Sequence, residues 1–571
     1  MPTPASLLRR LLRIHALHGT GEASAKRELL RGLERRRLGS AREVRRLHGA
    51  LCFLHAYPDD AALLRQVERM LGAFSRRPDL RRFAAELEDS GIAGTATEYA
   101  FYWSTARWLA RRCPASFHVD WTEFERTERL DALLGLLVPA GESLALDEAD
   151  RTTQEWIDLL KGPAETDAAF ILRRLERIPG DDFTREAFFE GIEIPFRVTP
   201  GAGAPTQSGA RYARSGPVVF RSRPLDRSRP DLAEEIRRPP LGMRAVSTRE
   251  GERLIDLTRE AMVTRERDLY VFRYADPRDV RLIDCGEGLQ FAAIGALPER
   301  RLVLDAVYGF LTLMNGVPIG YVLSSAYLNS VEVAYNVFEH FRGGEAAKIY
   351  GRVIAMLAWL FDADAFTIDP YQLGGEGNTE GLESGAWWFY YKLGFRPRDP
   401  AARRVMNREL RKMRADPGHR STIATLEKLA AKNLFWFKGR PRDDIRGVFR
   451  LDRIGLWVSR YVARRFGADR EAAVQTCSEE AQRLLGVRSL RGWTRDERSA
   501  WERWSPLVLS LPGVARWSLE SRRALARVAR AKGGRRESDF VRELDRHRPL
   551  RRALLAIASG RGRSQSRSPE A

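Results

Sequence analysis

The first 194 residues alternate apolar and charged positions with the spacing of amphipathic helices. In segments 42–57 and 61–74, apolar residues recur every three or four positions, with Arg and Glu between them. Prolines and glycines separate such segments and are typical of helix boundaries. We therefore predict an N-terminal helical domain over 1–194.

This periodicity disappears between residues 195 and 244, where Pro, Gly, Ser and Arg dominate and apolar residues are too few to pack. Such a composition is typical of a linker, or of a loosely held strap that lies across a neighbouring domain. The sequence leaves both interpretations open.

Residues 245–400 combine strand and helix patterns. Segment 302–328 holds two long apolar runs joined at Asn315-Gly316, a dipeptide that strongly favours a tight β-hairpin. The elements predicted after the hairpin are a strand over 330–338, a helix over 345–361, a strand over 364–371 and a helix over 384–395.

After Pro397 the pattern is helical again, and it predicts a basic helical region over 401–558. The last residues, 559–571, are polar and are expected to be disordered. The fold class predicted from these patterns is α+β, with a central mixed sheet and its helices between all-α regions at both ends.

Composition excludes several classes of protein. The chain has 571 residues, of which 44% are hydrophobic and 30% charged, and this balance favours a globular multidomain protein. The longest apolar run, Val353 to Phe361, is too short to span a bilayer. The first residues lack the apolar core of a secretory signal, and the four cysteines are not spaced for zinc. We expect a cytoplasmic protein without a metal site.

The formal net charge of +20 is distributed unevenly. Residues 401–571 carry 41 basic and 19 acidic side chains, whereas residues 241–400 carry 17 basic and 22 acidic ones. A basic region of this kind is either a solvated surface or a contact for a polyanion such as RNA. Any such contact is expected in the C-terminal third.

A glycine turn separates the 330–338 strand from the helix that follows. Gly343 and Gly344 can adopt positive φ angles and allow a ligand to approach the backbone closely. The unpaired N–H groups at a helix N-terminus attract anions, so this turn is a candidate cradle for a pyrophosphate.

The turn and the later helix together resemble the GNAT acyltransferase superfamily over about 150 residues. In that family an Arg/Gln-x-x-Gly-x-Gly/Ala turn holds the pyrophosphate of acyl-coenzyme A, and a helix reading Asn-x-x-Ala-x-x-Phe-Tyr-x-Lys-Leu-Gly-Phe follows one strand later. The matching turn positions are Arg342, Gly343, Gly344, Ala346 and Ala347. The matching helix positions are Ala386, Phe389, Tyr390, Lys392, Leu393, Gly394 and Phe395.

Two positions depart from the family pattern. Glu345 stands where the turn has a glycine, and Glu383 stands where the helix has an asparagine, for which Asn378 is a candidate replacement. A carboxylate on a first helical turn is mildly favourable without a ligand but repels a pyrophosphate. Either the Glu345 side chain points away from the turn, or the phosphate site is lost.

The resemblance also implies catalytic roles. Tyr390 would protonate the leaving thiolate, and Glu332, on the strand before the turn, would act as a base through water. A backbone N–H near Val337 and Phe338 would polarise the thioester carbonyl. Packing beside Phe389 is the alternative role for Tyr390.

We therefore expect a GNAT-like N-acyltransferase that transfers an acetyl or other acyl group from coenzyme A to an unidentified amine. Two other functions remain open. One is a degenerate GNAT-like module that binds without catalysis, which Glu345 and Glu383 favour. The other is a GNAT-like aminoacyl-tRNA-dependent transferase, which the basic C-terminal third favours.

Overall fold

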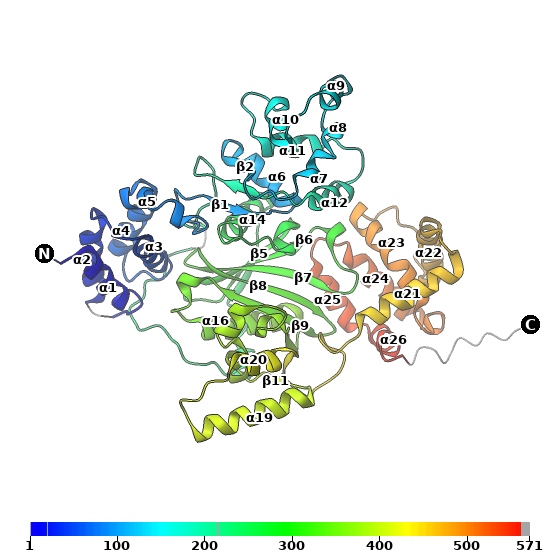
Figure 1. The fold of residues 1–571 in the computed structure, drawn as a ribbon. Coiled ribbons are helices and arrows are strands. Elements are labelled where there is room, and N and C mark those ends of the chain that lie inside the picture. The colour runs from blue at the N-terminus through cyan, green and yellow to red at the C-terminus, as the bar shows by residue number, and fades with distance from the viewer. Residues whose placement is uncertain (1, 20, 214–215, 561–571) are drawn as a thin grey trace, which may run out of the picture.

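The computed structural model describes residues 2–19, 21–213 and 216–560, and its centre is a mixed sheet that is nine-stranded within these residues (Figure 1). The strand order is β11-β12-β10-β9-β8-β7-β6-β5-β4. The strands are β4 (Gly242–Ala245), β5 (Ala275–Asp284), β6 (Leu289–Ala296), β7 (Ala306–Met314), β8 (Val317–Tyr327), β9 (Ser330–Val337), β10 (Ala365–Ile368), β11 (Arg396–Pro397) and β12 (Leu434–Phe437). The predicted mixed sheet flanked by helices is confirmed.

Neighbouring strands of the sheet are antiparallel except β9 and β10, which run parallel. The predicted hairpin joins β7 to β8, with Asn315 and Gly316 at φ angles of 50° and 80°. These angles suit a two-residue turn whose twist matches that of the strands.

Helices cover the sheet and connect its strands. Those nearest to it in sequence are α13 (Leu232–Glu235), α14 (Thr248–Val263), α15 (Tyr270–Arg273), α16 (Ala346–Phe361), α17 (Thr379–Glu383) and α18 (Ala386–Lys392). Helix α16 joins the two parallel strands, as the sequence pattern predicted.

The N-terminal helices form two groups with separate hydrophobic cores (Figure 1). The first group, which shares its core with the central sheet, contains α1 (Pro4–Ile14), α2 (Glu22–Glu34), α3 (Ala41–Ala56), α4 (Ala61–Gly72) and α5 (Pro78–Arg82). The second contains β1 (Thr97–Tyr99), α6 (Trp103–Arg112), β2 (Phe117–Val119), α7 (Thr127–Asp131), α8 (Leu134–Leu137), α9 (Ala140–Glu148), α10 (Thr153–Leu160), α11 (Asp167–Leu175), α12 (Asp182–Ile192) and β3 (Phe196–Val198). The prediction of an all-α N-terminal region is wrong here, because β3 pairs antiparallel with both β1 and β2 in a small sheet.

Residues 199–241, which we call the strap, connect the second group to β4 and cross the first group on the way. Hydrogen bonds hold the strap along its length: Gln207 N–H donates to Gly91 O (2.8 Å), Tyr212 N–H to Gly316 O (2.8 Å) and Arg221 N–H to Pro58 O (2.8 Å). The buried side chain of Asn315 accepts from Val219 N–H and donates to Val219 O and Ala56 O. These contacts favour the interpretation of this segment as a strap across a neighbouring domain over that of a free linker.

The C-terminal helices are α19 (Pro400–Ala415), α20 (Ile423–Ala430), α21 (Leu451–Phe466), α22 (Arg470–Leu485), α23 (Arg495–Ser510), α24 (Leu519–Lys532), α25 (Glu537–Arg546) and α26 (Arg548–Ala558). Helix α25 packs on β7 and β8. The helical prediction is wrong for Leu434–Phe437, because pairing with β10 and β11 makes this aromatic segment strand β12. Helix α19 extends from the body in Figure 1 and exposes basic side chains, but RNA binding stays a prediction.

No helix in the described ranges is long and apolar enough to cross a membrane. The predicted disordered tail, 559–571, lies outside the described residues except for Ser559 and Gly560.

Asn315 links the hairpin, the strap and α3, so its removal is expected to loosen all three. Asn315→Ala deletes three hydrogen bonds and places alanine at positive φ, which predicts a loss of about 2–4 kcal/mol in unfolding free energy. Urea unfolding measures the loss, and limited trypsin digestion should cleave the strap faster. Asn407→Ala, on exposed α19, is the control and should change stability by less than about 0.5 kcal/mol. Equal effects of both variants would contradict this role.

A buried carboxyl on α25 predicts a pH dependence of stability. Burial raises the pKa of Asp545 to about 7, against the opposing effect of the Asn329 N–H that it accepts. Because the folded protein holds this proton more tightly than the unfolded chain, the contribution of Asp545 to stability falls as pH rises from about 4 to 7, by at most about 1.4 kcal/mol per pH unit. Asp545→Asn should flatten this part of the stability–pH curve, and exposed Asp539→Asn should leave it unchanged.

Candidate functional site

The turn between β9 and α16 presents an open helix N-terminus. The N-cap residue, Glu345, makes no capping hydrogen bond with its side chain, and within the described chain the N–H groups of Ala346 and Ala347 find no acceptor. Such groups carry the positive end of the helix dipole and are suited to an anion. The strap reaches the same turn, where Arg227 Nη2 donates to Gly343 O (2.9 Å).

The two glycines of the turn differ from the prediction, since neither has a positive φ angle. Gly344 is favoured for another reason. A Cβ atom there would lie 3.1 Å from Phe341 O and 3.2 Å from the hydroxyl of Tyr57, whereas one at Gly343 would meet open space. Close approach of α3 to the turn, and not backbone conformation, therefore explains the small residue at 344.

Glu345 faces the strap and not the helix end. Its carboxylate is buried, lies 3.1 Å from Arg221 Nη2 and 3.6 Å from Lys348 Nζ, and accepts the N–H of Asp226 (3.1 Å). Two cations and a backbone donor thus neutralise the carboxylate that departs from the family pattern. Of the two alternatives for Glu345, this geometry favours the one in which the turn remains usable.

Four tyrosines gather beside the turn. The rings of Tyr335 and Tyr390 lie 5.2 and 5.5 Å from that of Tyr350, and Tyr335 donates its hydroxyl proton to Ala346 O (3.0 Å). The hydroxyls of Tyr57 and Tyr350 are buried and have no hydrogen-bond partner in the described chain. Burial raises the pKa of all four hydroxyls, so each carries its proton at neutral pH. Tyr390 is therefore packed against Tyr350 and protonated at neutral pH.

The other predicted residues lie around this centre with partners of their own. Phe338 N–H donates to Ile319 O (3.0 Å), so this donor is already engaged, and Val337 O accepts from Arg342 Nε (3.3 Å). Asn378 caps α17, because its Oδ1 accepts Gly381 N–H (3.0 Å) while its Nδ2 donates to Tyr371 O (2.7 Å).

Glu332 lies further back along β9. Its carboxylate is 3.5 Å from Arg446 Nε, and burial raises its pKa while Arg446 opposes the rise. It does not line the pocket described next.

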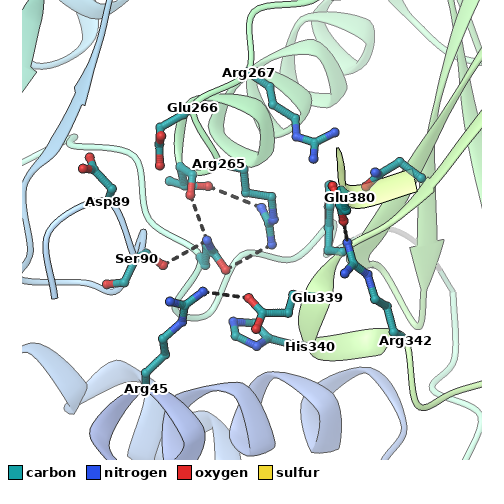
Figure 2. A pocket seen from close by; sticks show the side chains of 14 residues that line it. Arg45, Asp89, Ser90, Arg265, Glu266, Arg267, Glu339, His340, Arg342 and Glu380 are labelled. Carbon is teal, nitrogen blue, oxygen red and sulfur yellow. Dashed lines mark hydrogen bonds and ion pairs between the residues drawn. The ribbon is translucent and has the colours of Figure 1, made fainter. Parts of the chain in front are cut away.

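A pocket of about 260 Å³ opens where β9 ends (Figure 2). Its walls come from α3, the loop at Asp89, the strap, the residues after α14, the end of β9 and α17. Arg342, from the turn, pairs with Glu380 on one side of the pocket, and Arg45 pairs with Glu339 (2.7 Å). Burial lowers the pKa of His340 to about 4, so this ring is neutral at pH 7.

Sequence reasoning did not find this pocket. Its side chains come from segments separated by up to about three hundred residues, and no spacing motif joins Arg45, Asp89 and Arg265 to the turn. The only sequence pattern near the pocket was a strand end followed by a glycine turn. This pattern predicted the neighbouring helix N-terminus but not the pocket.

Comparisons with known proteins give no family for this chain. No protein-family model, curated protein or solved structure matches it. Among the described residues, no group of three or more His, Cys, Asp or Glu side chains is arranged to hold a metal ion.

The Glu345 contacts predict a structural role for this carboxylate. Glu345→Gln leaves Arg221, whose side chain is 12% exposed, with only the more distant and more exposed carboxylate of Glu287 (3.9 Å). Because a mostly buried guanidinium is costly to leave without a close anion, we expect a loss of about 1–3 kcal/mol in unfolding free energy, measured by urea denaturation. The control, exposed Glu383→Gln, should have an effect below about 0.5 kcal/mol. An unchanged stability in Glu345→Gln would contradict the pairing.

Proposed function

We propose that this protein is an acyl-coenzyme A-dependent N-acyltransferase that uses acetyl-coenzyme A or another acyl-coenzyme A and acts on an amine. The observation that carries the proposal is the uncapped N-terminus of α16, with free N–H groups at Ala346 and Ala347 beside the unpartnered hydroxyl of Tyr57. Phosphate groups are the ligands that an open helix N-terminus of this kind recognises best.

The position of this helix in the sheet supports the same proposal. Helix α16 connects the parallel strands β9 and β10, so its N-terminus lies at the carboxyl end of β9. Where a helix connects two parallel strands, as here, the carboxyl ends of the strands and the helix N-terminus form a common ligand position in α/β sheets. The turn residues that match the acyltransferase pattern all lie at this position.

The proposed acyl transfer needs a group that donates a proton and a group that accepts one. When the amine nitrogen attacks the thioester carbon, the carbon–sulfur bond breaks and the amine loses a proton while the thiolate gains one. Tyr390 is the proposed donor to the thiolate because it occupies the position that the acyltransferase pattern gives to the proton donor and is protonated at neutral pH, although burial raises its pKa and makes it a weaker acid. We do not assign the base to Glu332, since its carboxylate faces Arg446 and not the pocket.

One observation favours the rival function, a binding module without catalysis. The N–H of Phe338, which the resemblance assigned to the thioester carbonyl, donates to Ile319 O instead. A protein that binds acyl-coenzyme A but does not transfer the acyl group would fit this arrangement. Binding and turnover are therefore separate measurements for this protein.

Acetyl-coenzyme A is expected to stabilise the protein by about 2.7 kcal/mol at one hundred times its dissociation constant, visible as a rise in Tm. Gly344→Val should weaken binding at least tenfold by calorimetry, because the new side chain meets Phe341 O and Tyr57. Gly439→Val, at an exposed glycine with open space, is the matched control. No stabilisation of the wild type by any acyl-coenzyme A would exclude the transferase.

Tyr390→Phe tests the proposed proton donor. Without the hydroxyl, kcat should fall about 100-fold with KM nearly unchanged, because the proton is needed only as the thiolate leaves. The control is Tyr391→Phe in the same helix. An unaltered kcat in Tyr390→Phe would assign this tyrosine to packing alone.

A further inference from the structure

The pocket at the end of β9 contains charges that the protein itself leaves unpaired. Two of its guanidinium groups, those of Arg45 and Arg342, pair with carboxylates of the same pocket. The other two, Arg265 and Arg267, have no carboxylate within ion-pair distance in the described chain. The carboxylates of Asp89 and Glu266 have no cation within ion-pair distance among the described residues, although Asp89 accepts the N–H of Glu98 (2.7 Å). They lie next to each other on the side away from Arg342 (Figure 2).

Arg265 is the clearest of these groups. Its guanidinium lies 3.6 Å from the centre of the Phe338 ring, and it donates only to neutral acceptors: Ala261 O (2.8 Å), Gln207 Oε1 (3.2 Å) and Thr264 Oγ1 (3.4 Å). Burial lowers its pKa to about 9. A partly buried cation without an anion is unfavourable, and a carboxylate is the planar anion that matches its geometry.

A second group in the pocket, an amide oxygen, lacks a hydrogen-bond donor. Asn336 is the residue before the last one of β9, and its Oδ1 atom is buried and receives no hydrogen bond from any described residue. A buried amide oxygen requires an N–H donor. Asn336 and Phe338 are two residues apart, so the missing donor and the missing anion belong to one ligand of small size.

We propose that this pocket binds the acyl acceptor and that the acceptor is a free α-amino acid with a positively charged side chain. Its carboxylate binds Arg265, with Arg267 as the second cation, and its side-chain cation lies between Asp89 and Glu266. Its α-amine donates to Asn336 Oδ1, which is closed to solvent in the free protein and turns toward the pocket when the ligand binds. This inference rests on the proposed transferase for the reaction, but the binding site stands on the contacts alone.

The proposed reaction conserves atoms and charge. The neutral α-amine forms a bond to the thioester carbon, the carbon–sulfur bond breaks, and its electron pair stays on sulfur. One proton leaves the amine and one reaches the thiolate. The products are an Nα-acyl amino acid and free coenzyme A. Because Asn336 adjoins the strand end that leads to the turn, it is the α-amine that faces the acyl donor.

Four ligands that differ by one group each test the site on the wild-type full chain by calorimetry, without acyl-coenzyme A. Lysine has all three recognised groups, cadaverine lacks the carboxylate, 6-aminohexanoate lacks the α-amine, and norleucine lacks the side-chain cation. We expect each of the last three to bind at least tenfold more weakly than lysine. Binding of cadaverine as tight as that of lysine, or binding of none of the four, would overturn the proposal.

Variants then assign each contact. In Arg265→Gln, lysine and cadaverine should bind equally; in Asn336→Leu, lysine and 6-aminohexanoate should bind equally. Arg45→Gln, which alters a paired arginine of the same pocket, should keep all three preferences. Should Arg265→Gln fail to fold, the four-ligand comparison and Asn336→Leu still decide. Loss of the carboxylate preference in Arg45→Gln as well would overturn the assignment to Arg265.

A separate titration with acetyl-coenzyme A distinguishes the two proposals. Lysine binding without acetyl-coenzyme A binding would keep the site and exclude the transferase. Acetyl-coenzyme A binding without lysine binding would exclude the acceptor site alone. With both ligands, mass spectrometry of the product should show Nα-acetyl-lysine, and the Nε isomer would overturn the proposed orientation.

Discussion

β9 pairs with β8 along all eight of its residues but with β10 only through Ser330, Val331 and Glu332, and the candidate site depends on this unequal pairing. Beyond Glu332 the strand continues to Val337 without a described partner on its second edge, because β10 ends at Ile368. An unpaired strand edge inside a protein needs other groups to fill the space and satisfy its polar atoms. Here the tyrosines, the turn before α16 and the pocket occupy that position. The point at which β9 stops pairing with β10 therefore sets the place of the candidate site.

Segments distant in sequence complete this open end. Arg45 comes from α3 and Tyr57 directly follows this helix, and Arg221 and Arg227 come from the strap. The ion pair of Arg221 with Glu345 shows why this arrangement matters. A carboxylate in the first turn of α16 opposes an anion site unless a cation holds it elsewhere, and the strap supplies that cation. The departure of Glu345 from the acyltransferase pattern and the presence of the strap are therefore one feature of the structure.

Local patterns predicted what local interactions determine. The Asn315-Gly316 hairpin and α16 follow from turn chemistry and apolar period, and both formed where expected. Strand β12 was missed, because its four residues become a strand only by pairing with β10, about seventy residues earlier. The pocket was missed for the same reason. Its unpaired groups, such as Arg265 and Asn336, can be recognised only from the three-dimensional structure, which shows that no partner lies near them. The spacing of residues along the chain does not contain this information.

The groups that would hold an acceptor are already fixed in the free protein. The Phe338 ring and three neutral acceptors keep the guanidinium of Arg265 in place, and the hydrogen bond of Phe338 N–H to Ile319 O fixes the strand end that carries this ring. Holding binding groups in position before the ligand arrives lowers the entropy lost on binding. The same arrangement keeps a cation partly out of water without an anion, which lowers the stability of the empty protein. The position of Arg265 thus favours ligand binding but lowers the stability of the protein without the ligand. Such a conflict is expected where a side chain binds a ligand and does not stabilise the fold.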